Sequence, residues 1–225
     1  PERMTVDRRH FLLQLGAALG TTCLPVLAHA QASGTRLRVA GGWRMNERDY
    51  QIGALSVDWE QGQVKTEFAH TLPTLPHAIV PEEGGGFLAV ATRPGTWMVR
   101  VDAQGKLVQR LTMAEEGDTR TLDGHVIASP DGRWLYTGET DRNTGAGWVS
   151  VRDARTLARV AQFPSGGIDP HQLLRAADGA LLLANGGIVR DASGRKIDLE
   201  RMAPVLSRID PARGHLLGQW QLPDA

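Results

Sequence analysis

Short apolar runs alternate with turn residues along most of the chain. The clearest set covers residues 77–111, where runs at 77–81, 84–90, 96–102 and 106–111 follow one another closely. Each run is bounded by Gly, Pro, Asp or Asn, the residues that commonly end strands. The pattern therefore predicts a unit of four short β-strands.

The same unit recurs further along the chain. Residues 124–163 and 170–220 repeat the order of runs, and the histidines that lead the three units, His77, His125 and His171, are 48 and 46 residues apart. A weaker unit precedes them in the runs at 37–40, 52–58 and 64–68. Self-similarity at a fixed period is the mark of a repeat architecture.

Tandem four-stranded units of this length are typical of a β-propeller, whose blades run roughly 40 to 50 residues. We predict an all-β propeller of about four blades at residues 31–225. A β-sandwich is the competing all-β fold, but nothing in a sandwich requires one pattern at a fixed period. Since the last run is followed only by Leu222–Ala225, where a next inner strand would begin, we expect a larger propeller of six to eight blades, truncated here.

The first thirty residues have the layout of a signal peptide. Arg8 and Arg9 directly precede an uncharged stretch that extends to Leu27, and the stretch is diluted by glycine and threonine. Paired arginines in this position are typical of twin-arginine export signals, and Ala28-His29-Ala30 predicts cleavage after Ala30. A membrane anchor or an N-terminal core helix is the alternative, although spanning a bilayer takes roughly 20 mainly apolar residues.

Composition narrows the function classes. The single cysteine, Cys23, lies inside the predicted signal peptide, so we expect no disulfide in the mature protein. Lys and Arg total 25 against 25 Asp and Glu. The sequence lacks the basic stripe that a nucleic-acid partner would require. Together with the predicted signal peptide, this composition indicates an exported protein. We expect it in a bacterial periplasm, without a permanent membrane anchor.

Several strings carry a family resemblance, at residues 124–132, 164–173, 183–188 and 196–204. From the second unit onward the chain resembles a family of uncharacterised, twin-arginine-exported bacterial propellers of the YVTN or WD-repeat type. The resemblance implies a link to periplasmic iron or haem acquisition, because genes of that family often stand beside those of imelysin-like iron-uptake proteins. The chain departs from the family at Thr140, where an asparagine is usual.

Candidate chemistry gathers at one predicted face. Innermost strands of a propeller start beside the central channel, so the three leading histidines should ring its mouth, with the loops at 139–147 and 185–205 rising beside them. This places imidazoles together with polar and charged groups on a candidate ligand-binding face: His77, Arg93, Asp123, His125, Glu139, Asp141, Asp169, His171 and Asn185. The histidines are candidate ligands of a transition metal. The competing interpretation is structural, with each Gly-His or Pro-His pair only fixing a turn.

Two functions follow from this pattern. The first is a non-catalytic periplasmic module that binds a ligand, or a partner protein of an iron-uptake system, through the histidine-bearing face. The alternative is a metal-dependent hydrolase or lactonase with its site at the channel mouth. Fold alone does not decide between them, because propellers carry many unrelated functions.

Overall fold

The computed structural model describes residues 36–117, 119–191 and 194–221. The predicted signal peptide, with Arg8, Arg9 and the cleavage after Ala30, lies outside these residues. The described residues from Leu37 onward belong to one unit, Leu37–Ala225. None of the helices in the described part of the chain has the length and apolar character needed to cross a bilayer.

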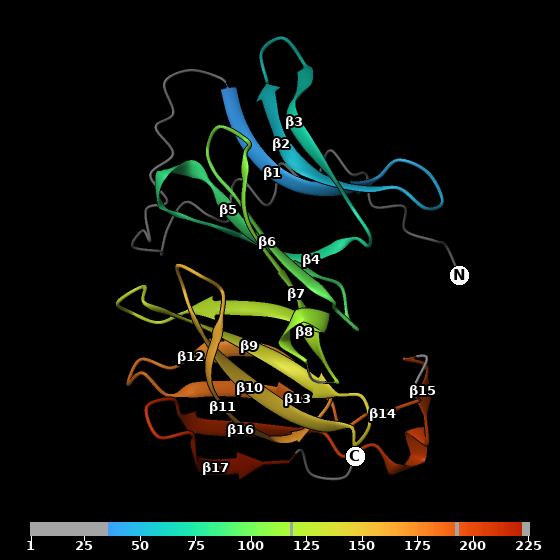
Figure 1. Cartoon of the computed structure of the whole chain (residues 1–225), viewed down its shortest axis with the longest axis vertical. Coiled ribbons are helices and arrows are strands. Elements are labelled where there is room, and N and C mark those ends of the chain that lie inside the picture. Colours follow the sequence, from blue (N-terminus) through green and yellow to red (C-terminus); the bar gives the residue numbers. More distant parts are fainter. Residues whose placement is uncertain (1–35, 118, 192–193, 222–225) are drawn as a thin grey trace, which may run out of the picture. The chain divides into compact units, whose positions relative to one another are not determined.

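The strands form successive sheets in chain order (Figure 1). The first sheet contains β1 (Arg36–Arg44), β2 (Tyr50–Asp58) and β3 (Gln63–Leu72). The second contains β4 (Pro76–Pro81), β5 (Phe87–Ala91), β6 (Trp97–Val101) and β7 (Leu107–Thr112). The third contains β8 (Arg120–Ala128), β9 (Trp134–Asp141), β10 (Ala146–Asp153) and β11 (Arg159–Ile168). The fourth contains β12 (Pro170–Arg175), β13 (Leu181–Asn185), β16 (Val205–Asp210) and β17 (His215–Trp220).

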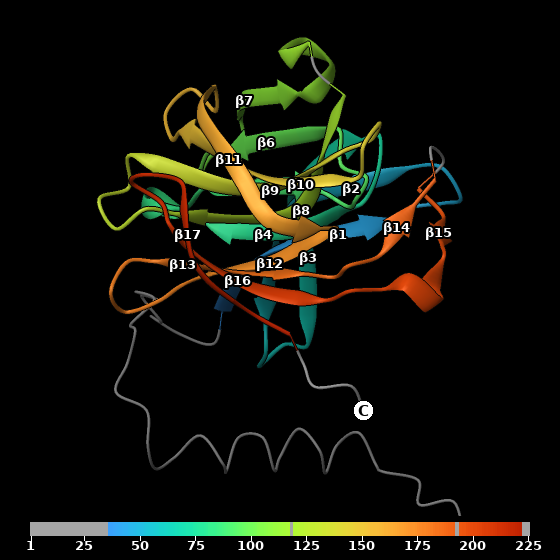
Figure 2. The ribbon, with the colours of Figure 1, turned by 90° about the horizontal axis from the view of Figure 1, so that it is seen from below.

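Short elements fill the connections. A hairpin of β14 (Val189–Arg190) and β15 (Lys196–Ile197) lies between β13 and β16, and Figure 2 shows its two strands side by side. Three 3-10 turns complete the described elements: η1 (Glu83–Gly85), η2 (Met113–Glu116) and η3 (Leu199–Arg201).

The sheets match the sequence repeat. The three units predicted from the apolar runs are the second, third and fourth sheets, each with four antiparallel strands, and the weaker early unit is the three-stranded first sheet. The all-β prediction with about four blades is confirmed. The described residues do not form the two facing sheets of a sandwich.

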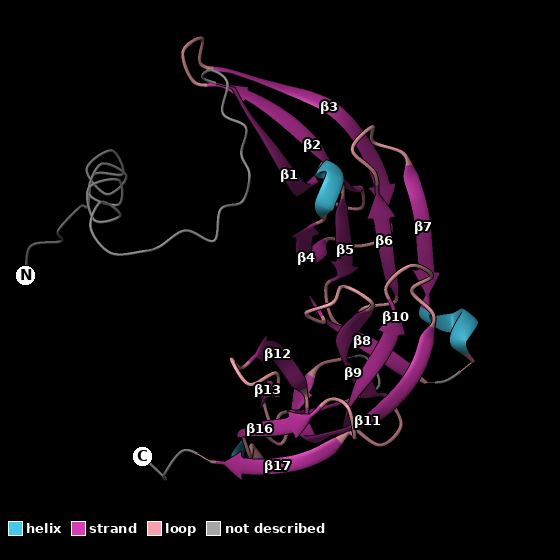
Figure 3. Cartoon of the chain, turned by 90° about the vertical axis from the view of Figure 1, so that its left-hand side faces the viewer, coloured by secondary structure: helices cyan, strands magenta, loops and turns pink. Residues whose placement is uncertain are grey.

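Apolar side chains pack on both faces of the inner sheets. Along β5, Leu88 and Val90 join one buried cluster with Leu122 and Leu135 of the third sheet. The intervening Phe87 and Ala89 join another cluster with residues of the first sheet. Successive side chains of a strand point to opposite faces. A strand covered on both faces therefore reads as a continuous apolar run, as β5 does. Figure 3 shows β5 between the strands of the first sheet and those of the third.

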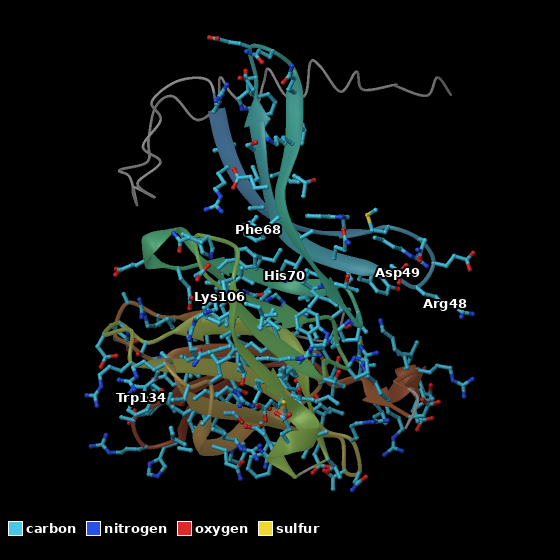
Figure 4. The ribbon with its side chains drawn as sticks, turned by 45° about the horizontal axis from the view of Figure 1, so that its top comes forward. Arg48, Asp49, Phe68, His70, Lys106 and Trp134 are labelled. Atoms are coloured by element: carbon cyan, nitrogen blue, oxygen red, sulfur yellow. The ribbon has the colours of Figure 1, made fainter. Side chains whose placement is uncertain are left out.

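Gly105 makes room for one of the contacts between the first and second sheets. Phe68 of β3 stacks on Phe87 with ring centroids 6.3 Å apart, and His70 Nε2 lies 2.7 Å from the carbonyl oxygen of Gly105 (Figure 4). Gly105 has φ of 84°, and a Cβ atom there would lie 2.5 Å from the Phe68 ring. Glycine thus supplies both the turn conformation and the space for the ring.

A turn carboxylate repeats from sheet to sheet. In each of the four larger sheets an aspartate ends or directly follows the penultimate described strand, and its Oδ1 accepts a hydrogen bond from a backbone N–H two or three residues later. The pairs are Asp58 with Gln61, Asp102 with Gln104, Asp153 with Arg155, and Asp210 with Ala212. This is an Asx turn, which lets the chain reverse into the outer strand.

Replacing Asp153 with Ala is expected to lower the melting temperature at neutral pH. Hydrogen bonds from Thr156 and Arg155 lower the pKa of the Asp153 carboxyl below 3.8. A lowered folded-state pKa means that the charged form stabilises the fold above the unfolded-state pKa, and that this contribution disappears as the pH falls through the folded-state pKa. Melting curves of the wild type and the variant should therefore converge in acid. Asp153→Asn keeps the Oδ1 acceptor and should lose less, so an equal loss in both variants would contradict the turn's role.

Candidate functional site

Three histidines occupy equivalent irregularities in the innermost strands of three sheets. The pairing register shifts between Pro76 and Ala78 in β4, between Leu122 and Val126 in β8, and between Pro170 and Leu173 in β12. His77, His125 and His171 lie within these shifts. A bulge re-aims the side chain that it carries.

The structure brings the three imidazoles together. One possible ligand atom from each ring can be chosen so that all three atoms lie within 4.8 Å of one another. The centroid of the His125 ring is 4.7 Å from that of His77 and 5.0 Å from that of His171. His77 Nε2 and His125 Nε2 are 3.1 Å apart and share a hydrogen bond, in which one ring donates and the other accepts. We call these residues the histidine cluster.

Two residues of the histidine cluster, His125 and His171, are held in their neutral form. Burial and the neighbouring rings of His77 and His171 lower the pKa of His125 to about 4. Burial, and next the positive charge of Arg93, also lower the pKa of His171. At neutral pH these rings therefore have nitrogen lone pairs free of an added proton. His171 Nδ1 is buried, and it has no hydrogen-bond partner among the described residues.

Gly124 lets two of these strands approach each other. Its φ is 97°, and a Cβ atom added there would lie 2.7 Å from Cδ2 of His77. Glycine therefore precedes His125 because the His77 ring of the second sheet occupies the space that a side chain would need. The hydrogen bond between His77 and His125 also connects those sheets, so the structural interpretation and the metal interpretation share the same geometry.

A pocket lies beside the histidine cluster, formed by three loops that each join the second and third strands of a sheet. Its lining comes from residues 93–94, 140–142, 144–145 and 188–191 and from Gly194, together with Thr121, Asp123, Ile168 and Asp169. The sequence placed the second and third of these loops beside the histidines, and the structure puts residues of both in the pocket wall. Asp141 lies there as predicted, and its Oδ1 accepts hydrogen bonds from the backbone N–H groups of Asn143 and Thr144.

Arg93, Asp123 and Asp169 line the same pocket. Arg93 Nη1 is 3.2 Å from Asp169 Oδ1, and the Asp169 side chain is 4% exposed. The Thr140 hydroxyl donates to the carboxyl of Asp123, with oxygen distances of 3.0 and 3.1 Å. Burial raises the pKa of Asp123 well above its usual 3.8.

Glu139 and Asn185 do not belong to this face, which corrects the sequence prediction. Glu139 is fully buried and its Oε1 accepts a hydrogen bond from Arg152 Nη2 at 2.6 Å, inside the third sheet's contact with η2. Asn185 is 2% exposed and bonds the hydroxyls of Ser165 and Ser207. Both side chains are buried and engage partners on other strands. Their position near strand ends in the sequence did not reveal these partners.

Arg190 is the pocket residue that sequence reasoning missed. Its Nε is 3.0 Å from Asp169 Oδ1, so it shares that oxygen with Arg93. The available signal was its place in the loop 185–205, but no motif distinguishes it there. Only the folding of the β14–β15 hairpin brings it to the pocket.

Comparisons with known proteins support the fold. The family described as "Protein of unknown function (DUF1513)" matches residues 70–225. Among curated proteins, no sequence matches the chain.

Three solved structures show the likeness. Hydrazine synthase of Kuenenia stuttgartiensis is 17% identical with a TM-score of 0.54, covering 78% of this chain and 46% of its own. A protein of Bacteroides fragilis NCTC 9343, provisionally described as a 6-phosphogluconolactonase, is 16% identical with a TM-score of 0.51, covering 82% and 55%. The WD40 β-propeller domain of Doa1 is 11% identical with a TM-score of 0.50, covering 79% and 52%. At these identities the likeness shows the propeller fold alone, and the chain spans about half the length of these neighbours.

Proposed function

We propose that this chain, which belongs to the DUF1513 family, is a propeller module that binds a transition-metal ion through His77, His125 and His171. The observation that carries the proposal is the convergence of three imidazoles from three separate sheets to within 4.8 Å. Imidazole nitrogen suits zinc, copper, nickel and iron.

The spacing of the ring nitrogens fits such an ion. Zinc–nitrogen bonds are about 2.0 to 2.1 Å long, so two nitrogens on a tetrahedral zinc ion lie about 3.3 Å apart. The 3.1 Å between the Nε2 atoms of His77 and His125 is close to that value, and both atoms can bind the ion once the donating ring carries its proton on Nδ1 instead. The widest pair would draw together by up to about 1.5 Å on binding, from its limit of 4.8 Å. Because the lowered pKa values keep His125 and His171 neutral, a metal ion would not compete with protons there at neutral pH.

The proposal also includes the cellular location of the protein. The twin-arginine pattern of residues 1–30 supports export to the periplasm, where the module would present its histidine-bearing face to a ligand or to a partner protein. The link to iron uptake, which the family resemblance implies, makes iron one of the ions to test.

Removing one imidazole is expected to weaken metal binding by at least about tenfold, and removing all three to abolish it. Isothermal titration with Zn²⁺, Ni²⁺, Cu²⁺ and anaerobic Fe²⁺ should be run on the chelator-treated chain. The variants are His77→Ala, His125→Ala, His171→Ala and the triple substitution. His215→Ala, an exposed histidine of β17 outside the histidine cluster, is the matched control and should bind as the wild type does. Equal affinity in the control and the triple variant would overturn the proposal.

A metal-dependent hydrolase or lactonase is the second candidate. Three histidine ligands leave a coordination position for water, as in catalytic rather than structural zinc sites. A bound metal would supply an activated water at that position, and the pocket beside the histidine cluster would hold the substrate. A panel of lactones and esters, assayed with the metal-loaded chain, tests this candidate. If the metal binds but no member of the panel is turned over faster than with the triple alanine variant, the binding module is retained and the hydrolase is rejected.

A further inference from the structure

The pocket beside the histidine cluster is a small hollow that opens to solvent. Its cavity volume is about 110 Å³. Small-molecule sites usually measure roughly 300 to 1,000 Å³, so this pocket suits only a compact ligand. Part of the wall is apolar, from Pro94, Ile168, Ile188 and Val189, and most of the remainder is charged or polar.

Two guanidinium groups converge on one carboxylate oxygen in this pocket. Arg93 Nη1 and Arg190 Nε lie 3.2 and 3.0 Å from Asp169 Oδ1, and both arginine side chains are 23% exposed. Arg190 also donates from Nη1 to the carbonyl oxygen of Gly194 at 3.1 Å. An arginine carries five N–H donors, so most donors of this pair are not used by Asp169.

Asp169 is the carboxylate of the described wall that contacts both arginines. The other acidic groups of the wall have partners of their own. The carboxyl of Asp123 accepts from Thr140, that of Asp141 accepts from backbone N–H groups, and that of Asp191 is paired with Arg195. Within the described part of the wall, Asp169 Oδ2 is buried and accepts no hydrogen bond. Both arginines therefore hold Asp169 through Oδ1 alone, and their remaining N–H donors are not used by Asp169 Oδ2.

We propose that Arg93 and Arg190 bind the oxyanion group of a small organic molecule, a carboxylate or a phosphate, in this pocket. Guanidinium groups match such groups in charge and in bidentate geometry. The carbon skeleton of the ligand packs on Pro94, Ile168 and Ile188. This binding site is distinct from the histidine cluster and does not require a metal ion.

The first test is direct binding to the chelator-treated full chain, measured by isothermal titration. The probes are succinate, malate and citrate as carboxylates, glycerol 3-phosphate and glucose 6-phosphate as phosphates, and glycerol and glucose as uncharged counterparts. We expect at least one acid to bind with saturation while the uncharged probes do not. Whether the carboxylates or the phosphates bind identifies the oxyanion. If no acid binds more tightly than its uncharged counterpart, the proposal is overturned.

Substitutions locate the binding. Arg93→Gln and Arg190→Gln should each weaken it about tenfold or more, the usual effect of losing a charged hydrogen bond. Arg195→Gln is the matched control, because Arg195 lies on the same hairpin with a side chain 79% exposed and outside the pocket lining. Equal affinity in all three variants would overturn the proposal.

Asp169→Asn separates ligand binding from a structural role. Asp169 has φ of 53°, a left-handed conformation that asparagine tolerates well. The substitution removes the negative charge that competes for both guanidinium groups, so we expect the acid to bind several-fold more tightly. If Arg93 and Arg190 only brace the loops, the same change would weaken binding or leave it unaltered, and that result counts against the proposal. A chain that binds acids but no metal would keep this inference and overturn the metal site, so the two failures are distinguishable.

Discussion

Replacing Arg152 with Met is expected to lower the free energy of unfolding by about 3 kcal/mol, the lower end of the cost of breaking a buried ion pair. Arg152 is fully buried and donates to both oxygens of Glu116, to Glu139 and to the Thr137 hydroxyl. Without it, the Glu139 carboxylate stays buried with a weaker set of partners. Urea unfolding at neutral pH, extrapolated to zero denaturant, measures the loss.

The size of that loss depends on what remains around Glu139. Arg159 Nη1 and Arg120 Nη1 lie 3.6 and 3.8 Å from Glu139 Oε2, so these two arginines still partly compensate the negative charge of Glu139. This is the reason for expecting the lower end of the range. Adding Glu139→Leu to Arg152→Met should recover part of the stability, because the buried carboxylate is then gone as well.

An exposed pair supplies the control. Arg213 pairs with Asp210 at 3.1 Å, and its side chain is 75% exposed. Arg213→Ala should cost under about 1 kcal/mol, as exposed ion pairs usually do. A loss in Arg152→Met no larger than in Arg213→Ala would contradict the central role of the buried network.

The repeat and the histidine positions could be predicted from sequence because both depend on local signals. Turn residues mark the ends of every strand, and the regular spacing of His77, His125 and His171 places them at equivalent points of successive sheets. Equivalent points on adjacent sheets of one repeat lie near each other in space. The convergence of the three rings therefore follows from the period.

Whether each polar side chain lines the pocket or is buried among partners could not be predicted in the same way. Glu139 and Asn185 stand at strand ends next to the predicted face, but their partners Arg152 and Ser207 come from other strands. Which face of a strand a polar residue occupies is settled by such partners. Arg190 reaches the pocket only through the β14–β15 hairpin, whose two-residue strands leave almost no periodic pattern.

The pocket and the histidine cluster are connected by short stretches of chain. Asp169 stands two residues before His171, and Asp123 two residues before His125. Arg93 contributes to lowering the pKa of both histidines. An anion bound at Arg93 would offset that positive charge beside His125 and His171.

Replacing Gly124 with Ala should both destabilise the fold and disorganise the histidine cluster. At φ of 97° an alanine is strained by about 1 to 3 kcal/mol. Its methyl group would also lie 2.7 Å from Cδ2 of His77, so the ring must move away from His125. We expect a loss of stability of about 3 kcal/mol or more in urea unfolding, and a Zn²⁺ affinity at least about tenfold lower.

Gly132→Ala separates strain from displacement of the ring. Gly132 has φ of 68°, and a Cβ atom there would meet nothing within 4 Å. This control should lose stability from backbone strain alone, keep the wild-type Zn²⁺ affinity, and leave the ring proton signals of His77 unshifted in the NMR spectrum. Gly124→Ala should shift those signals even before metal is added, because the ring itself is displaced. If both variants show the same affinity and the same His77 signals, the close approach of Gly124 to His77 does not position the cluster.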